Sequence, residues 1–123
     1  MTADHPTILI AEDDAQSLLY FSMVLRQEYR VETARSVDRA LSLMKKQPPD
    51  LILLDLSLEG KRDGLDLVRL MRKHREWKQI PVIAATAHAL KQDRDNCLKA
   101  GCDAYLAKPI PMKKLVDTVH AFL

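Results

Sequence analysis

Short apolar runs recur five times along the chain, and after each comes a segment whose apolar residues have helical spacing. The runs occupy residues 7–11, 30–34, 51–54, 81–85 and 103–107. They show little alternation between apolar and polar residues, which is typical of parallel strands that are covered on both faces. Residues 30–34 and 103–107 fit this pattern less well than the others. Pro81 opens its run, where a missing N–H disturbs a strand least.

The segments between the runs predict helices. Apolar residues three and four positions apart form a stripe within residues 18–25, 37–44, 67–71 and 115–122. Residues 89–100 carry a poorer stripe among charged side chains, made by Leu90, Cys97 and Leu98. We expect Gly101 to end this helix, because glycine tolerates a left-handed backbone conformation.

Strands and helices therefore alternate from end to end. Ser36 is placed to cap the start of one helix, and Pro111 lies near the start of the last. The alternation predicts an α/β fold, in which five helices sandwich a doubly wound, five-stranded parallel sheet. The length of 123 residues fits a single domain.

Composition narrows the classes of function. A net charge of +2 is too small to indicate nucleic acid as a direct partner. The chain has neither an apolar run of about 18 residues nor a signal-peptide pattern, so we expect a cytoplasmic protein without membrane contact. Cys97 and Cys102 do not have the spacing of metal ligands, and we expect reduced, packed thiols rather than a disulfide.

Polar residues follow four of the predicted strands. In an open parallel sheet, ligands bind beyond the carboxyl ends of the strands, where the strand order reverses. The residues that this edge would receive are Glu12, Asp13, Asp55, Thr86 and Lys108. Three carboxylates so close together repel one another unless a hard divalent cation such as Mg²⁺ joins them. With a lysine and a threonine hydroxyl beside them, they would suit phosphoryl transfer to an aspartate.

Each of these residues also has an ordinary structural explanation. The acidic triplet at residues 12–14 suits a helix N-terminus, which is the role we expect for Asp14. Asp55 could end a strand in a turn, Thr86 could cap a helix, and Lys108 with the following proline could form a turn. Their joint occurrence at four strand ends of one alternating chain favours a functional site.

Four stretches give the chain a resemblance to the receiver domain of two-component response regulators, over nearly its whole length. They are ILIAEDD at residues 8–14, PDLILLD at 49–55, PVIAATA at 81–87 and GCDAYLAKP at 101–109. The resemblance implies a flavodoxin-like (βα)5 receiver fold and one receiver domain over residues 1–123. It also implies a signalling switch that catalyses only its own phosphorylation and dephosphorylation, and is not otherwise an enzyme.

The resemblance further implies the chemistry of the site. Asp55 would be the phosphoacceptor, and Lys108 would pair with the phosphoryl group. Mg²⁺, with Mn²⁺ as an alternative, would be held by Glu12, Asp13, Asp55 and the backbone carbonyl of Ser57. Asp13 would be the direct ligand of the acidic pair, with Glu12 acting through water.

A set of switch residues is implied in the same way. Thr86 would turn toward the phosphoryl group, and Tyr105 would move inward with it, unless Tyr105 is simply a half-exposed strand residue. The Lys108–Pro109 peptide bond would be cis. Ser57 and His88 would tune the lifetime of the phosphoryl group, although His88 could equally be an exposed residue at a helix start.

The implied partners are proteins. A histidine kinase or a histidine phosphotransfer protein would donate the phosphoryl group from a phosphohistidine. A downstream protein would read the face built from the 89–100 helix, the 103–107 strand and the 111–122 helix. The protein would be a monomer or a weak, phosphorylation-dependent dimer.

Two departures and two alternatives remain open. Glu59 stands where the family usually has proline, in a loop that looks one residue longer, and is either a further carboxylate near the metal or a solvated loop acid. One alternative is a pseudo-receiver that binds proteins and is never phosphorylated. The other is a Mg²⁺-dependent phosphohydrolase of the haloacid dehalogenase type, although Ser57 stands where such enzymes place a second aspartate.

Overall fold

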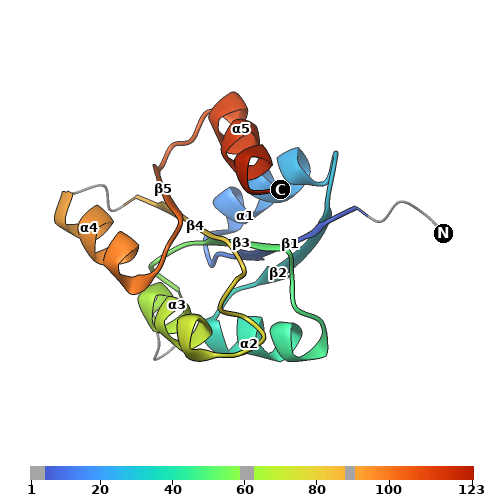
Figure 1. Ribbon diagram of the computed structural model, residues 1–123. Coiled ribbons are helices and arrows are strands. Elements are labelled where there is room, and N and C mark those ends of the chain that lie inside the picture. The colour runs from blue at the N-terminus through green and yellow to red at the C-terminus, as the bar shows by residue number, and fades with distance from the viewer. Residues whose placement is uncertain (1–4, 59–62, 88–90) are drawn as a thin grey trace.

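The computed structural model describes residues 5–58, 63–87 and 91–123, and its helices and strands alternate as predicted. The strands are β1 (Thr7–Ala11), β2 (Arg30–Ala34), β3 (Leu51–Leu54), β4 (Val82–Thr86) and β5 (Ala104–Ala107). The helices are α1 (Ala15–Leu25), α2 (Val37–Lys46), α3 (Gly64–Lys73), α4 (Lys91–Ala100) and α5 (Met112–Phe122). Figure 1 shows their arrangement.

Three predicted boundaries are wrong by one residue at the strand or helix start. Pro81 precedes β4, because it has no N–H for the ladder, and β4 instead continues to Thr86. Asp103 precedes β5, and its carboxylate accepts a hydrogen bond from the backbone N–H of Val82 at 2.8 Å. Pro111 has an extended backbone and stands before α5 rather than in it.

The strands form one parallel sheet in the order β2-β1-β3-β4-β5. The chain runs outward from β1 to β2 and then crosses back over β1 to β3. The strand order therefore reverses between β1 and β3, and the adjoining carboxyl ends are the expected place for a ligand. This is the doubly wound fold that the sequence predicts.

Helices cover both faces of the sheet (Figure 1). On one face α1 and α5 pack on strand side chains such as Ile10, Leu53 and Ile83. On the other, α2, α3 and α4 pack on the neighbouring strand residues, such as Leu9 and Ile52. Because both faces of the central strands are buried, successive residues of a strand such as β3 are all apolar, which explains its continuous run in the sequence.

Local side-chain hydrogen bonds define the helix starts. The side chains of Asp14, Ser36 and Asp63 each accept a backbone N–H from the first turn of the following helix, which confirms the expected roles of Asp14 and Ser36. Gly101 follows α4 with a φ of 120°, as expected for a residue that ends a helix. Among the described residues, no helix is long and apolar enough to cross a membrane.

Helix α4 is the least anchored of the helices. Its single buried residue within Lys91–Ala100 is Cys97, and Leu98 is exposed. The predicted contribution of Leu98 to an apolar stripe is therefore wrong, since the charged residues around it leave only one position for the core. Leu90 and the predicted first turn at residues 89–90 lie outside the described residues.

Candidate functional site

The predicted site residues lie at the carboxyl ends of the strands, either as the last residue of a strand or just after it. The backbone N–H of Asp55 donates to the carbonyl of Ala11 at 2.8 Å, which continues the pairing of β1 with β3. The N–H of Lys108 donates to the carbonyl of Thr86 at 2.9 Å and continues the pairing of β4 with β5. The sheet thus fixes the backbone from which these side chains extend.

The acidic residues come together as the sequence predicts. Glu12, Asp13 and Asp55 each offer a carboxylate oxygen, and these oxygens lie within 4.8 Å of one another. Glu12 is 1 % exposed and Asp55 is 7 % exposed, so two of the three carboxylates have little contact with bulk water. A set of hard oxygen donors at this spacing fits Mg²⁺, which binds through one or two carboxylates and completes its shell with carbonyl, water or phosphate oxygens.

Burial also changes the acidity of the cluster. Desolvation by burial, together with the neighbouring Asp55 carboxylate, raises the pKa of Glu12 to about 7. The Lys108 ammonium and the backbone N–H of Asp14, which donates to Glu12 Oε2 at 3.1 Å, work against this shift. A bound cation would offset the repulsion that raises the pKa.

Lys108 is the positive charge of the site. Its Nζ lies 2.6 Å from Glu12 Oε1 and 3.3 Å from Asp55 Oδ2. Burial on its own would lower the pKa of Lys108, but the hydrogen bond to Glu12 and the Asp55 charge raise it, so the ammonium stays protonated. The sequence indicated a contact between Lys108 and the phosphoryl group but gave no signal of the shorter pairing with Glu12, which joins residues 96 positions apart.

Thr86 and Ser57 lie at the same place. Thr86 is fully buried and, with Asp55, Ser57 and Lys108, lines a hollow of about 240 Å³ above the strand ends. The N–H of Ser57 donates to Asp55 Oδ1 at 3.1 Å, which orients that carboxylate.

Two further predicted features fall near this hollow. The Lys108–Pro109 peptide bond is cis, as expected. Tyr105 is half-buried in β5 and packs against the cluster on the α4 side of the sheet, and desolvation by burial raises its pKa. The remaining predicted residues, His88 and Glu59, lie outside the described residues.

Gly64 supports the loop that carries Asp55, a role that the sequence reasoning missed. Its N–H donates to the carbonyl of Leu56 at 3.0 Å. A Cβ atom at this position would lie 2.7 Å from the Asp55 carbonyl oxygen and 2.9 Å from Leu56 Cα. A single sequence carries no signal of such a close backbone approach.

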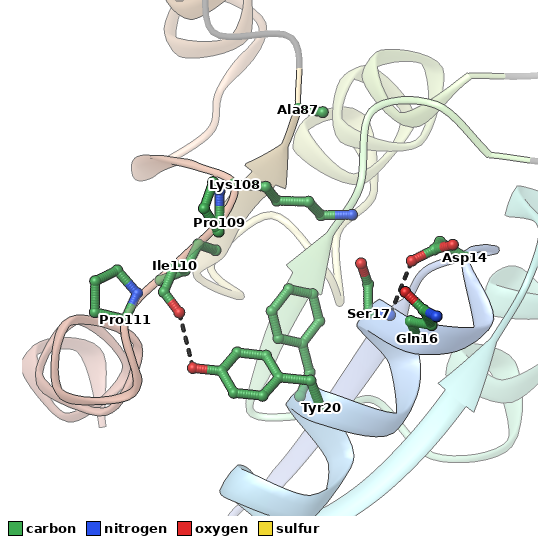
Figure 2. Close-up of a pocket in the computed structure, with 10 residues that line it drawn as sticks. Asp14, Gln16, Ser17, Tyr20, Ala87, Lys108, Pro109, Ile110 and Pro111 are labelled. Carbon is green, nitrogen blue, oxygen red and sulfur yellow. Dashed lines mark hydrogen bonds between the residues drawn. The ribbon is translucent and has the colours of Figure 1, made fainter.

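A groove of about 700 Å³ opens beside the hollow, between the start of α1 and the loop from β5 to α5 (Figure 2). Asp14, Ser17 and Lys108 line both spaces, so the groove is continuous with the site. The Tyr20 hydroxyl donates to the carbonyl of Ile110 at 2.8 Å across its floor (Figure 2). No local sequence pattern indicates this groove, because its walls come from distant parts of the chain.

Comparison with known proteins places the chain in a family. The family model of the response regulator receiver domain matches residues 8–120. The polar-differentiation response regulator DivK of Brucella ovis is 33 % identical over 118 residues, which cover 95 % of each chain.

Solved structures agree with this match. The receiver domain of the sensor histidine kinase PA1611 from Pseudomonas aeruginosa PAO1, which has a magnesium ion coordinated in its active site cleft, superposes with a TM-score of 0.87. It is 34 % identical, and the match covers 96 % of this chain and 97 % of that one. The Mn(2+)-bound form of the response regulator Rcp1 has a TM-score of 0.79 and 25 % identity, with 94 % and 90 % of the two chains covered. The protein therefore belongs to the response regulator receiver domain family and has the role of a phosphoryl-accepting domain in two-component signalling.

Proposed function

We propose that Asp55 is the residue that accepts the phosphoryl group in this receiver domain. The observation that carries the proposal is the convergence of Asp55 with Glu12, Asp13 and Lys108 at the carboxyl ends of the strands, with carboxylate oxygens within 4.8 Å of one another. A carboxylate beside a metal-binding acidic pair and a lysine has the groups that phosphoryl transfer needs.

The transfer is a displacement at phosphorus. An Asp55 carboxylate oxygen forms a bond to the phosphorus of a phosphohistidine, the phosphorus–nitrogen bond breaks, and its electron pair remains on the imidazole nitrogen, which takes up a proton. Lys108 donates hydrogen bonds to the phosphoryl oxygens as the transfer proceeds. Mg²⁺ bound by Glu12, Asp13, Asp55 and the Ser57 carbonyl would neutralise charge on the same oxygens, and Mn²⁺ has a similar preference for oxygen ligands.

Phosphorylation would change the position of Thr86 and Tyr105. The phosphoryl group adds about two negative charges and new acceptor oxygens within reach of the buried Thr86 hydroxyl. Movement of Thr86 would leave space for Tyr105 on the α4 side of the sheet. We assign α4, β5 and α5 as the face that a downstream protein reads, because α4 is the helix with the fewest buried side chains.

The groove beside α1 is the entrance that we assign to the phosphoryl donor, a histidine kinase or a histidine phosphotransfer protein. It opens from solvent toward Lys108 and is continuous with the hollow that Asp55 lines. Residues 1–123 would act as one receiver domain in the cytoplasm, as a monomer or a weak phosphorylation-dependent dimer, with signalling rather than substrate turnover as its activity.

Intact-mass measurement after incubation with acetyl phosphate and Mg²⁺ tests the proposal. The wild type should gain one phosphoryl mass, which a chelator abolishes, and Asp55→Asn should gain none. Asp50→Asn is the matched control, since Asp50 is an exposed aspartate at the opposite end of β3. No gain in the wild type, or an equal gain in Asp55→Asn, would favour a pseudo-receiver or another acceptor. Sustained release of phosphate from a small phosphoester would instead favour a phosphohydrolase.

A further inference from the structure

The C-terminus of α4 brings two cysteines together. The N–H of Gly101 donates to the carbonyl of Leu98, and the N–H of Cys102 donates to the carbonyl of Cys97, both at 3.1 Å. With Gly101 at a φ of 120°, this is a Schellman motif. That motif characteristically packs the side chain of the residue whose carbonyl accepts the hydrogen bond that spans more residues, here Cys97, against the side chain that follows the glycine, here Cys102.

The two thiols share one apolar environment. Cys97 is 0 % exposed and Cys102 is 6 % exposed, and both belong to the cluster on the α2–α4 side of the sheet. Both are free, in agreement with the expectation from the sequence. The hydrogen bond from the Cys102 N–H to the Cys97 carbonyl joins their backbones and keeps the two residues adjacent.

A half-buried arginine holds the motif in place. Arg72 of α3 donates to the Gly101 carbonyl from Nε at 3.0 Å and from Nη2 at 2.8 Å. Its Nη2 also contacts Asp103 Oδ2 at 3.0 Å. Gly101, which lies between the two cysteines in the sequence, is therefore anchored to α3. This anchor restricts how far the thiols can separate.

The thiols also perturb each other. Interaction with the Cys102 thiol lowers the pKa of Cys97, and the same interaction together with burial raises the pKa of Cys102. The hydrogen bond between the two thiols therefore favours the thiolate on Cys97. Because the thiolate is the attacking species in disulfide exchange, the pair has one nucleophile and one adjacent partner.

We propose that Cys97 and Cys102 are a redox modification site that forms an intramolecular disulfide with a low-molecular-weight disulfide such as oxidised glutathione. The Cys97 thiolate attacks the glutathione disulfide and releases one glutathione thiolate. The Cys102 thiol then loses its proton and attacks the mixed disulfide at the Cys97 sulfur, which releases the second glutathione. The two cysteines lose two electrons and two protons, and one oxidised glutathione becomes two reduced glutathiones.

The disulfide would include Cys97, which is the one buried side chain among the described residues of α4. It would tether the last turn of this helix to the entry of β5, at the face assigned above to partner recognition. The proposal does not depend on phosphorylation, and its readout is the mass of the two thiols rather than uptake at Asp55.

The test is incubation of the native protein with oxidised glutathione, followed by acid quenching, alkylation of remaining thiols and mass spectrometry. The expected product is a monomer lighter by about 2 Da that dithiothreitol restores. Trypsin cuts after Lys99, between the cysteines, and spares Lys108 because proline follows it. The expected digest therefore contains peptide 95–99 linked to peptide 100–113.

A comparison with the unfolded protein shows whether the fold favours formation of the disulfide. The equilibrium ratio of disulfide to dithiol in glutathione buffers should be at least about tenfold higher in the native protein than in urea, because the motif holds the thiols together. Cys97→Ala and Cys102→Ala should each abolish the 2 Da loss. Thiols that stay reduced in the native protein, stop at a glutathione adduct, link two chains, or pair more readily in urea would each overturn the proposal.

Discussion

Lys108 contacts two carboxylates, that of Glu12 in the acidic pair and that of Asp55, the proposed phosphoacceptor. Its Nζ is 2.6 Å from Glu12 and 3.3 Å from Asp55, and it is the cation that balances the acidic cluster before any metal binds. Because Glu12 is almost fully buried, removal of this cation would leave its carboxylate without a counter-ion. Glu12 could respond by taking up a proton, which limits the cost.

Replacement of this cation should therefore affect both chemistry and stability. We expect Lys108→Met to slow phosphoryl uptake from acetyl phosphate by about 10–100-fold, since one positive group would be lost from the transferring oxygens. The free energy of unfolding without Mg²⁺ should fall by about 1–3 kcal/mol. Initial rates and urea unfolding would measure these quantities. Lys113→Met, which removes an exposed lysine paired with Asp117, is the control and should change neither. An unaltered rate in Lys108→Met would contradict this role.

The raised pKa of Glu12 predicts a pH dependence of stability without metal. Its pKa is about 7 in the folded protein, against an ordinary value of 4.5, so between these values the folded state holds a proton that the unfolded state releases. This contribution is complete below about pH 4.5 and is lost as the pH rises through 7. The free energy of unfolding of wild type minus that of Glu12→Gln should fall over this interval in chelator. Mg²⁺ should reduce the fall at the upper end. A difference that is flat with pH would contradict the assignment.

At the level of helices and strands, two glycines allow neighbouring elements to approach each other closely, and they lie in different parts of the fold. Gly64 at the start of α3 allows the helix to approach the loop that carries Asp55, whereas Gly101 at the end of α4 lies against Arg72. An added Cβ would be crowded at both positions, and at Gly101 the backbone conformation is also unfavourable for other residues. Only the first position borders the site.

The two alanine variants should therefore separate stability from function. We expect Gly64→Ala and Gly101→Ala each to lower the free energy of unfolding by about 1–3 kcal/mol, because packed backbone and side chains must shift. Under conditions where both are folded, Gly64→Ala should also slow phosphoryl uptake and weaken Mg²⁺ binding. Gly101→Ala should leave both near the wild-type values. Equal effects on uptake would mean that Gly64 has no specific role in positioning Asp55.

The elements were predictable because their signals are local. Continuous apolar runs indicated strands covered on both faces, and Ser36, Asp14 and Gly101 indicated helix ends through backbone hydrogen bonding and conformation. Leu98 was not predictable, since a stripe with so few apolar residues does not define which side faces the core. The resemblance to receiver domains supplied the roles of the site residues, which the residues alone left open.

At the scale of the whole molecule, the site and the proposed reading face lie on neighbouring strands. Thr86 ends β4 inside the site, and Tyr105 lies in β5, opposite Ala84 of β4. The covering helix α4 has one buried side chain, whereas α3 has three. Under the proposed function, a change at the phosphoryl group would reach α4 through these two adjacent strands.

Hydrogen exchange should detect this difference. We expect backbone amides of α4 to exchange faster than those of α3, and phosphorylation or a stable phosphoryl mimic to change exchange in α4 and β5 selectively. Thr86→Val should keep phosphoryl uptake within about threefold of wild type but lose most of the exchange change, because it lacks the hydroxyl donor. The same exchange response in Thr86→Val would contradict the proposed coupling.

Contacts between distant parts of the chain could not be predicted from the sequence. The groove depends on Tyr20 meeting Ile110, 90 residues away, and the charge balance depends on Lys108 meeting Glu12. The strand order brings the carboxyl ends of the strands to one edge of the sheet. Which side chains pair at that edge depends on how they pack in three dimensions. Arg72, which donates hydrogen bonds to the carbonyls of Lys78, Ile80 and Gly101, likewise makes contacts that no local sequence pattern indicates.

Chemical mapping of the phosphoryl group is the most direct test that Asp55 is the phosphoacceptor. Borohydride reduces an aspartyl phosphate to homoserine, so the modified position can be read from peptide fragments after phosphorylation with acetyl phosphate and Mg²⁺. We expect homoserine at position 55 alone, and none without Mg²⁺. Homoserine at position 13 or elsewhere, or no reducible phosphate in folded wild-type protein, would contradict the assignment of Asp55.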